Sequence, residues 1–242
     1  MLKLMRGELY RLFHKKSMYI YFAALAVMYA LVIYVRSGGF TAQSVVEDAM
    51  NLFYLLPALV GGLLFSAIYV DDLNSKNLIT MVGFGTSKAK IVATKFILMT
   101  LLSAVAFALV PLFHCAVYAL LGWTPTAHSW LMVYAVSLKY FLITVGFAVL
   151  SGIVVYGLQR TTFAMVLYIM LAFNVISGLV ALALKSFAPS LTNFLMSGLS
   201  DRVMLAVAGG SSVIVPIAEW AVYVVIAGVL SVLAFHKKEM EF

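Results

Sequence analysis

The chain has 242 residues, of which 64% are hydrophobic and only 10% are charged, and its formal net charge is +7. A soluble domain is about half apolar and about a quarter charged, so this composition excludes a water-soluble fold. The apolar runs begin at Met18 and continue almost to the end, with no polar block long enough to fold separately. We therefore expect one membrane domain over residues 1–242. Cys115 is the only cysteine, which excludes an internal disulfide and a thiolate metal cluster.

Six apolar segments are long enough to cross a bilayer as helices, which takes about 20 residues. They are residues 18–35, 52–70, 91–121, 130–158, 162–184 and 213–235. The third and fourth exceed the length of an upright span, so we expect each to include an interfacial extension. The predicted fold class is an all-α integral membrane protein with six transmembrane helices.

Lysine and arginine are distributed unevenly between alternate loops, which predicts the orientation of the chain. Eleven lie on one side: Lys3, Arg6, Arg11, Lys15, Lys16, Lys76, Lys88, Lys90, Arg160, Lys237 and Lys238. The alternate loops hold only Arg36, Lys185 and Arg202. We expect a multi-pass cell-membrane protein with cytoplasmic N- and C-termini. The basic charge is then an orientation signal, and no nucleic-acid partner is expected.

The N-terminal segment, residues 1–16, precedes the first span. A helix there places Leu2, Met5, Leu9, Leu12 and Phe13 on one face, with the basic residues largely elsewhere. This pattern predicts a basic amphipathic helix along the inner membrane surface. The alternative is a charged stub that is needed only for topology.

The inner loop, residues 71–90, is predicted to contain a short helix that is capped by Asp72 and includes Leu78. Gly83 and Gly85 can end this helix, and Thr86 or Ser87 can cap the third span. A short cytoplasmic helix of this kind is suited to dock in a groove of another protein. The alternative is a solvated connection.

The outer loop, residues 185–212, has many apolar residues and few charges. It predicts short helices that dip back toward the outer leaflet, like a re-entrant loop. The alternative is a cap packed on the outer surface of the spans.

Three ionisable residues lie within apolar runs, where a charge is costly. Lys139 is expected to extend to the outer interface, and His114 to be a neutral, hydrogen-bonded residue between helices. Glu219 lies in the outer leaflet of the sixth span, either in a structural ion pair or hydrogen bond, or on a substrate path. Gly61 and Gly62 in the second span favour close helix packing or a hinge.

The sequence lacks the common motifs for nucleotide binding and catalysis: there is no GxxxxGK[ST], no HExxH, no nucleophile elbow and no cluster of carboxylates. We therefore expect no catalytic residue, no metal site and no cofactor on this chain. An enzyme embedded in the membrane would need several catalytic side chains at one depth, which the sequence does not offer.

Two segments carry a resemblance to a known family. They are residues 4–16, LMRGELYRLFHKK, and residues 77–95, NLITMVGFGTSKAKIVATK, which follows the acidic exit of the second span. Together with six spans, they resemble the membrane subunits of type-2 ABC transporters, the ABC-2 permeases. A departure is the Gly83 to Thr86 stretch, where many relatives have a proline or a single glycine.

The resemblance implies that the first segment is a connecting helix and that the inner loop is the coupling loop of a separate ATPase. These roles fall on Glu8, Arg11, Asp72, Asn77, Leu78, Gly83, Ser87 and Lys88. Two permease copies, or one copy and a homologous permease, would pair with two ATP-binding subunits that hold ATP and Mg. The second and fifth spans would then lie near the permease dimer interface.

By the same resemblance, the chain looks most like bacterial plasma-membrane permeases that export lantibiotics, bacitracin or other amphipathic peptides. The alternative function is an ion-coupled secondary transporter that uses Glu219, His114 or Lys139. That transporter would work without an ATPase partner, although no inverted repeat of broken helices is evident in the two halves.

Overall fold

The computed structural model describes residues 2–35, 42–74, 77–124 and 126–237, and it contains helices and no strands within these ranges. Five helices there are long and apolar enough to cross a membrane, and a bent helix pair makes up to six. The predicted all-helical fold is confirmed and its long apolar helices are compatible with a membrane protein, whereas a count of six requires the bent pair to be a single span. Arg36, Lys76 and Lys238, which were used to predict the orientation, lie outside the described ranges.

The first two helices follow one another with two residues between them. Helix α1 (Leu2–Phe13) is short, and α2 (Lys16–Val35) is the first candidate span. Only 6% of the residues in the apolar window of α2 are buried inside the protein, so one side of the helix is left for lipid or for another chain.

The second span runs from Ser44 to Leu73, which is longer than the predicted segment of 52–70. It joins α3 (Ala42–Phe53), a π-helical turn (Pro57–Gly61), α4 (Gly62–Phe65), a second π-helical turn (Ser66–Val70) and α5 (Asp71–Asn74). Hydropathy did not detect the early start of this span because α3 is amphipathic and only one of its faces is apolar. Val45, Ala49 and Phe53 form its buried stripe at a spacing of four residues.

Close packing explains Gly61 of the second span. A Cβ atom on Gly61 would lie 2.1 Å from the Tyr168 hydroxyl and 2.7 Å from a methyl group of Thr144. These two contacts leave no room for a side chain at Gly61, so the structure favours close packing over a hinge at this residue.

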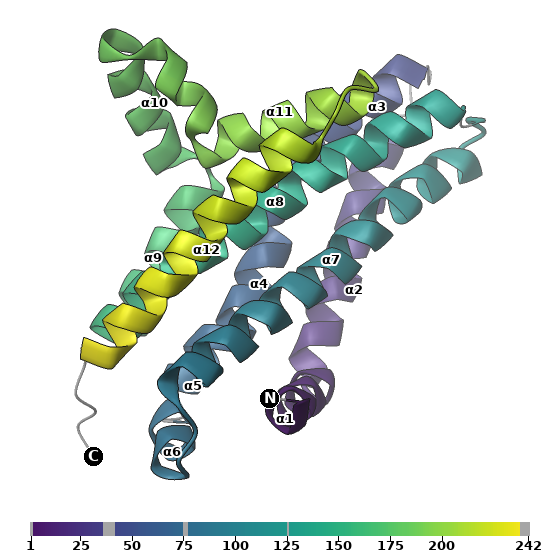
Figure 1. The fold of residues 1–242 in the computed structure, drawn as a ribbon. Helices are drawn as coiled ribbons and strands as arrows, with labels where there is room; N and C mark the ends of the chain where they lie inside the picture. The colour runs from purple at the N-terminus through teal and green to yellow at the C-terminus, as the bar shows by residue number, and fades with distance from the viewer. Residues whose placement is uncertain (1, 36–41, 75–76, 125, 238–242) are drawn as a thin grey trace.

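The long helices α7 (Lys88–Leu120) and α8 (Ala127–Leu158) are continuous over 33 and 32 residues. A capping box between Thr126 and Ser129 begins α8, and Gln159 ends it in a left-handed conformation with φ of 53°. Helix α8 packs against α3, α7, α9, α11 and α12. It is therefore the central helix of the bundle (Figure 1).

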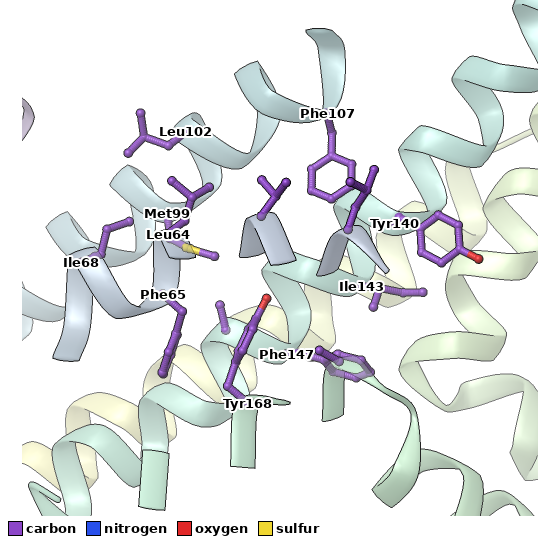
Figure 2. Close-up of a cluster of buried hydrophobic side chains, with 14 of the residues drawn as sticks. Leu64, Phe65, Ile68, Met99, Leu102, Phe107, Tyr140, Ile143, Phe147 and Tyr168 are labelled. Atoms are coloured by element: carbon purple, nitrogen blue, oxygen red, sulfur yellow. The ribbon is translucent and has the colours of Figure 1, made fainter. Parts of the chain in front are cut away.

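The core lies where the second span meets α7, α8 and α9 (Thr161–Ala172) (Figure 2). Its labelled side chains are Leu64, Phe65, Ile68, Met99, Leu102, Phe107, Tyr140, Ile143, Phe147 and Tyr168. The ring of Phe65 stacks on that of Tyr168 with the centroids 4.7 Å apart. This contact ties the second span to α9 beside Gly61 and Gly62.

The predicted fifth span is bent by 57° between α9 and α10 (Val175–Phe187). Asn174 lies at the break with φ of 56°, a left-handed conformation that asparagine tolerates better than most residues. Helix α10 stands apart from the bundle in Figure 1, and its main contacts are with α9 and the turn that follows it.

The loop predicted over residues 185–212 contains a 3₁₀ turn (Pro189–Phe194) and α11 (Met196–Ala208). Helix α11 packs on α8 and on the last helix, α12 (Ile214–Lys237), with Met196, Leu199 and Val203 buried. Both the re-entrant interpretation and the surface-cap alternative allow this packing, and the choice between them stays a prediction.

The elements are sorted between two ends of the molecule (Figure 1). Helix α1, the short helix α6 (Asn77–Gly83) and the C-terminal end of α12 lie at one end, which we call the inner end. Helices α10 and α11 and the beginning of α3 lie at the opposite, outer end. The names follow the predicted orientation.

Candidate functional site

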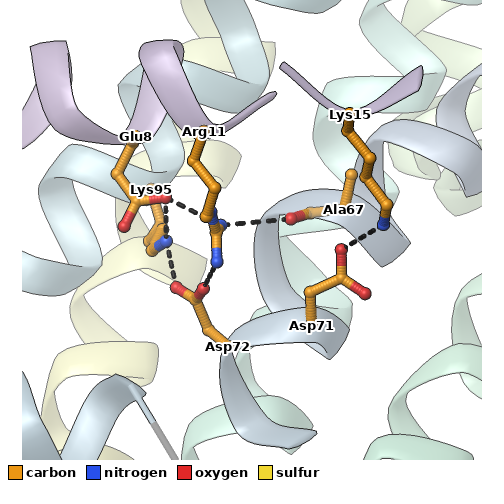
Figure 3. A network of polar contacts seen from close by, with 7 residues as sticks. All are labelled: Glu8, Arg11, Lys15, Ala67, Asp71, Asp72 and Lys95. Carbon is orange, nitrogen blue, oxygen red and sulfur yellow. Dashed lines mark hydrogen bonds and ion pairs between the residues drawn. The ribbon is translucent and has the colours of Figure 1, made fainter. Parts of the chain in front are cut away.

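Four charged side chains meet at the inner end, and we call them the inner ionic cluster: Glu8 and Arg11 of α1, Asp72 of α5, and Lys95 of α7 (Figure 3). Arg11 Nη2 donates to Glu8 Oε2 at 2.8 Å, and Lys95 Nζ lies 2.8 Å from the same oxygen. Both cations also pair with the carboxylate of Asp72. The cluster therefore joins the N-terminal helix to the second and third spans.

Burial makes this cluster unusual for charged groups. Asp72 and Lys95 are 1% exposed and Glu8 is 5% exposed, while two cations and two carboxylates balance one another. A buried charge that loses its partner costs several kcal/mol, whereas a compensated set is tolerated. Glu8, Asp72 and Lys95 therefore depend on one another, and on the partly exposed Arg11, to remain buried.

Two further contacts attach the same segments. Arg11 Nη2 also donates to the backbone oxygen of Ala67 at 3.2 Å. At the edge of the cluster, Lys15 lies 2.5 Å from Asp71, and both groups are partly exposed (Figure 3). The N-terminal segment is thus connected to the end of the second span at three points.

The local sequence explains how α1 contributes to the cluster. Glu8 and Arg11 are three residues apart and lie on the same helical face. Leu12 is buried next to them, whereas Leu2 and Phe13 are exposed. The apolar face predicted for this segment is thus divided, with one part turned to the spans and the other turned outward.

One predicted role of Asp72 is wrong. The carboxylate was expected to cap the short helix of the inner loop, but Asp72 lies inside α5 and pairs with Arg11 and Lys95. The short helix, α6, begins at Asn77. The second π-helical turn directly before α5 sets the direction in which this carboxylate points.

The end of α6 follows the prediction. Gly85 has φ of +79°, and the Thr86 amide donates to the Met81 oxygen at 3.1 Å, as in a Schellman-type helix end. Leu78 is buried against the core, so α6 is fixed at its base. Gly83 and Gly85 flank Phe84, whose side chain is 85% exposed at the tip of the segment.

The residues after this tip connect α7 to α12. Ser87 occupies the N-cap position of α7 in an extended conformation, without a side-chain hydrogen bond to the helix. Lys88 Nζ donates to the backbone oxygen of Phe235 at 2.9 Å and lies over its ring. A cation near the last carbonyls of a helix is favourable, so Lys88 stabilises the end of α12.

A small pocket lies beside the inner ends of α5 and α8. It has a volume of about 380 Å³ and is lined by Leu73, Gln159, Arg160, Thr161, Thr162 and Phe163. Its place next to α5 makes it part of the same inner surface as α6.

Two ion pairs at the outer end bind α11 to its neighbours, and we call them the outer ion pairs. Asp201 lies 2.6 Å from Lys139 of α8, and Arg202 lies 2.6 Å from Glu219 of α12. Lys139, which was expected only to reach the interface, has an acidic partner. Glu219 has the ion pair that was one of its two alternatives.

His114 is buried between α2, α3 and α7, as predicted. Its Nε2 lies 3.1 Å from the backbone oxygen of Val45, and its Nδ1 lies 2.5 Å from the Tyr29 hydroxyl. A carbonyl only accepts, so Nε2 carries the proton and Nδ1 of a neutral ring accepts from Tyr29. The structure therefore places His114, Lys139 and Glu219 in three separate contacts.

Sequence reasoning missed Lys95 and Phe84. Lys95 stood inside a segment read as an apolar span, and the signal was a single lysine in that span together with acidic residues on its neighbours. Phe84 had no signal, because one aromatic residue in a loop does not change its hydropathy pattern.

Among the residues that the structure describes, no group of His, Cys, Asp or Glu could hold a metal ion.

Comparison with known proteins adds no assignment: no family model matches the chain, and no curated protein matches it. The inner ionic cluster and the exposed tip of α6 are therefore the features from which a function can be inferred.

Proposed function

We propose that the chain is the transmembrane permease subunit of an ATP-driven exporter. Its substrate would be an amphipathic peptide, a lantibiotic or a similar hydrophobic molecule, and the ATP would be hydrolysed by a separate subunit. The observation that carries this proposal is α6 with Phe84, which extends from the inner end next to the buried ionic cluster.

Phe84 has the properties of an anchor for a protein partner. A large aromatic side chain that is 85% exposed leaves apolar area uncovered, and aromatic residues carry much of the energy of protein interfaces. The flanking Gly83 and Gly85 have no side chains that would keep a partner away. A groove on an ATPase subunit could therefore enclose the ring.

A mechanical path leads from this tip to the spans. Helix α6 contacts α5, where Asp72 pairs with Arg11 of α1 and with Lys95 of α7. A displacement of α6 by the partner would reach the first three spans through these buried charges. This arrangement suits a subunit that receives motion from outside its own chain.

The partner would supply the nucleotide chemistry. The sequence has no GxxxxGK[ST] motif, so ATP and Mg would be bound by the ATPase, in two copies that pair with two permeases. Asn77, Ser87 and Lys88 would then lie at or near this contact, with Lys88 also holding the end of α12.

Co-purification tests the proposal. The chain is expressed with the ATPase encoded by a neighbouring reading frame, and the amount of bound ATPase is compared between the wild type and Phe84→Ala. We expect a loss of tenfold or more, because removal of a central aromatic anchor costs at least about 2 kcal/mol. The matched control is Phe187→Ala at the outer end, where the ring is 89% exposed.

Two outcomes of the co-purification would contradict the proposal. One is equal binding by Phe84→Ala and the wild type, and the other is an equal loss in both variants. Robust ATP hydrolysis by the purified chain alone would also exclude a separate motor subunit.

The alternative, an ion-coupled secondary transporter, has less support. Its candidate residues do not share a site: Lys139 and Glu219 are held in separate pairs, and His114 is sealed between helices. Substrate uptake into vesicles that contain only this chain and an ion gradient would favour it.

A further inference from the structure

The face of α1 that is turned away from the spans has a distinct composition. Lys3, Arg6, Tyr10 and Phe13 follow one another at steps of three and four residues, and all are exposed. Leu2 is exposed beside them. Two cations and three large apolar or aromatic side chains therefore share one outward surface.

The cations on this face are free to bind an external group. Arg11 and Lys15 are engaged by Asp72 and Asp71, but Lys3 and Arg6 form no ion pair with any residue that the structure describes. Glu8, the only acidic residue of α1, is buried in the inner ionic cluster on the opposite face. The outward face is therefore positively charged without local compensation.

The position of α1 identifies what this face meets. Helix α2, an apolar candidate span, begins at Lys16, three residues after α1 ends at Phe13. The end of a span lies at the depth of the lipid headgroups, so α1 is held at that depth. A surface that combines cations with exposed aromatic residues suits a layer where acidic headgroups meet acyl chains.

We propose that the outward face of α1 binds acidic phospholipid headgroups. The inner ionic cluster on the opposite face connects this contact to the ends of the second and third spans, so the charge of the membrane surface tunes the stability of the inner end. This role does not depend on transport or on an ATPase.

Lipid composition tests the proposal directly. The chain is placed in nanodiscs of phosphatidylcholine, or of equal parts phosphatidylcholine and phosphatidylglycerol, and its thermal unfolding is followed. We expect a higher unfolding temperature in the acidic discs and at least half of this rise to be lost in Lys3→Gln/Arg6→Gln. The control, Lys90→Gln/Lys237→Gln, removes two exposed cations from the same end and should keep most of the rise.

A local probe separates this contact from general effects. Gly7 lies on the outward side of α1 with nothing within 4 Å of an added Cβ, so Gly7→Cys in a Cys115→Ala background can carry a polarity-sensitive dye. Emission should shift to the blue in acidic discs, and Lys3→Gln/Arg6→Gln should abolish the shift. Inorganic phosphate added to phosphatidylcholine discs should not reproduce it.

Three results would overturn the proposal. They are an unchanged lipid response in Lys3→Gln/Arg6→Gln, an equal loss in the Lys90 and Lys237 control, and a dye shift produced by inorganic phosphate alone.

Discussion

The inner ionic cluster and the outer ion pairs use the same chemistry in two different settings. At the inner end, two cations and two carboxylates are interlocked, and Asp72 and Lys95 are each 1% exposed. At the outer end, two separate pairs remain partly open, with Glu219 at 31% and Asp201 at 47%. Shared partners and burial make the inner charges mutually dependent, while each outer pair stands alone.

The difference indicates a division of labour between the two ends. A buried charge network is costly to break, so α1, the second span and α7 should move together at the inner end. Partly exposed pairs contribute less than buried ones, so the outer ion pairs add little to the apolar packing that holds α11 on α8 and α12. A transporter that is driven from the inside and opens on the outside would need this asymmetry.

The largest expected effect is the loss of Lys95. Lys95→Met leaves the carboxylates of Glu8 and Asp72 with Arg11 as their only cation in the cluster, and we expect a destabilisation of about 3 to 5 kcal/mol. Unfolding of the purified chain measures it. The double variant Lys95→Met/Asp72→Asn should recover part of the loss, because it removes one uncompensated charge.

Additive losses from Lys95→Met and Asp72→Asn would contradict the mutual dependence of the cluster. In that case the four residues would act as independent contacts, and the contrast with the outer end would disappear.

A smaller effect concerns packing rather than charge. Gly61→Ala places a methyl group 2.1 Å from the Tyr168 hydroxyl of a buried ring, and we expect a loss of about 1 to 3 kcal/mol. Gly146→Ala in α8 meets the flexible end of Met196 of α11, which can rotate away, so its loss should be smaller. Equal losses in an unfolding measurement would show that α11 is held as rigidly as α9.

The smallest effect is expected for the outer pair of Glu219. Glu219→Gln should cost about 1 kcal/mol or less, because the pair is partly exposed and stands alone. High salt should reduce this cost further by screening, while the cost of Lys95→Met should persist. A loss as large as that of Lys95→Met would mean that the membrane buries the outer pairs.

The same Glu219 variant also addresses the substrate path. If a cationic peptide displaces Arg202 from Glu219, then Glu219→Gln in the reconstituted complex should weaken substrate-stimulated ATPase activity and leave basal activity nearly intact. Normal stimulation in this variant would leave Glu219 with a structural role alone.

The spans were largely predictable because a membrane demands long apolar segments. The left-handed end of α6 at Gly85 and the hydrogen-bonded state of His114 also followed from local chemistry. The early start of the second span did not, because Glu47 and Asp48 interrupt the apolar run while Val45 and Ala49 continue its buried stripe.

The inner ionic cluster could be predicted only in part. Glu8, Arg11 and Asp72 were selected through the resemblance to permeases, but as contacts for an ATPase rather than for one another. Their meeting point depends on how α1 packs against two spans that are distant in the sequence. Arg11 and Asp72, for example, are 61 residues apart. A local pattern does not contain that distance, so Lys95 was not connected to them.

The two π-helical turns of the second span change the direction in which the side chains that follow them point around the helix axis. Each residue of an α-helix turns the chain by about 100°, and a π-helical turn holds one residue more than an α-helical turn. If Ser66–Val70 formed regular α-helix with no residue removed, Asp72 would rotate by roughly 90° away from Arg11 and Lys95, whereas deletion of one residue there would let the turn relax to α-helix with Asp72 nearly in place. The pitch of this span is therefore as specific as its composition, and a regular α-helix of the same length would not place Asp72 beside Arg11 and Lys95.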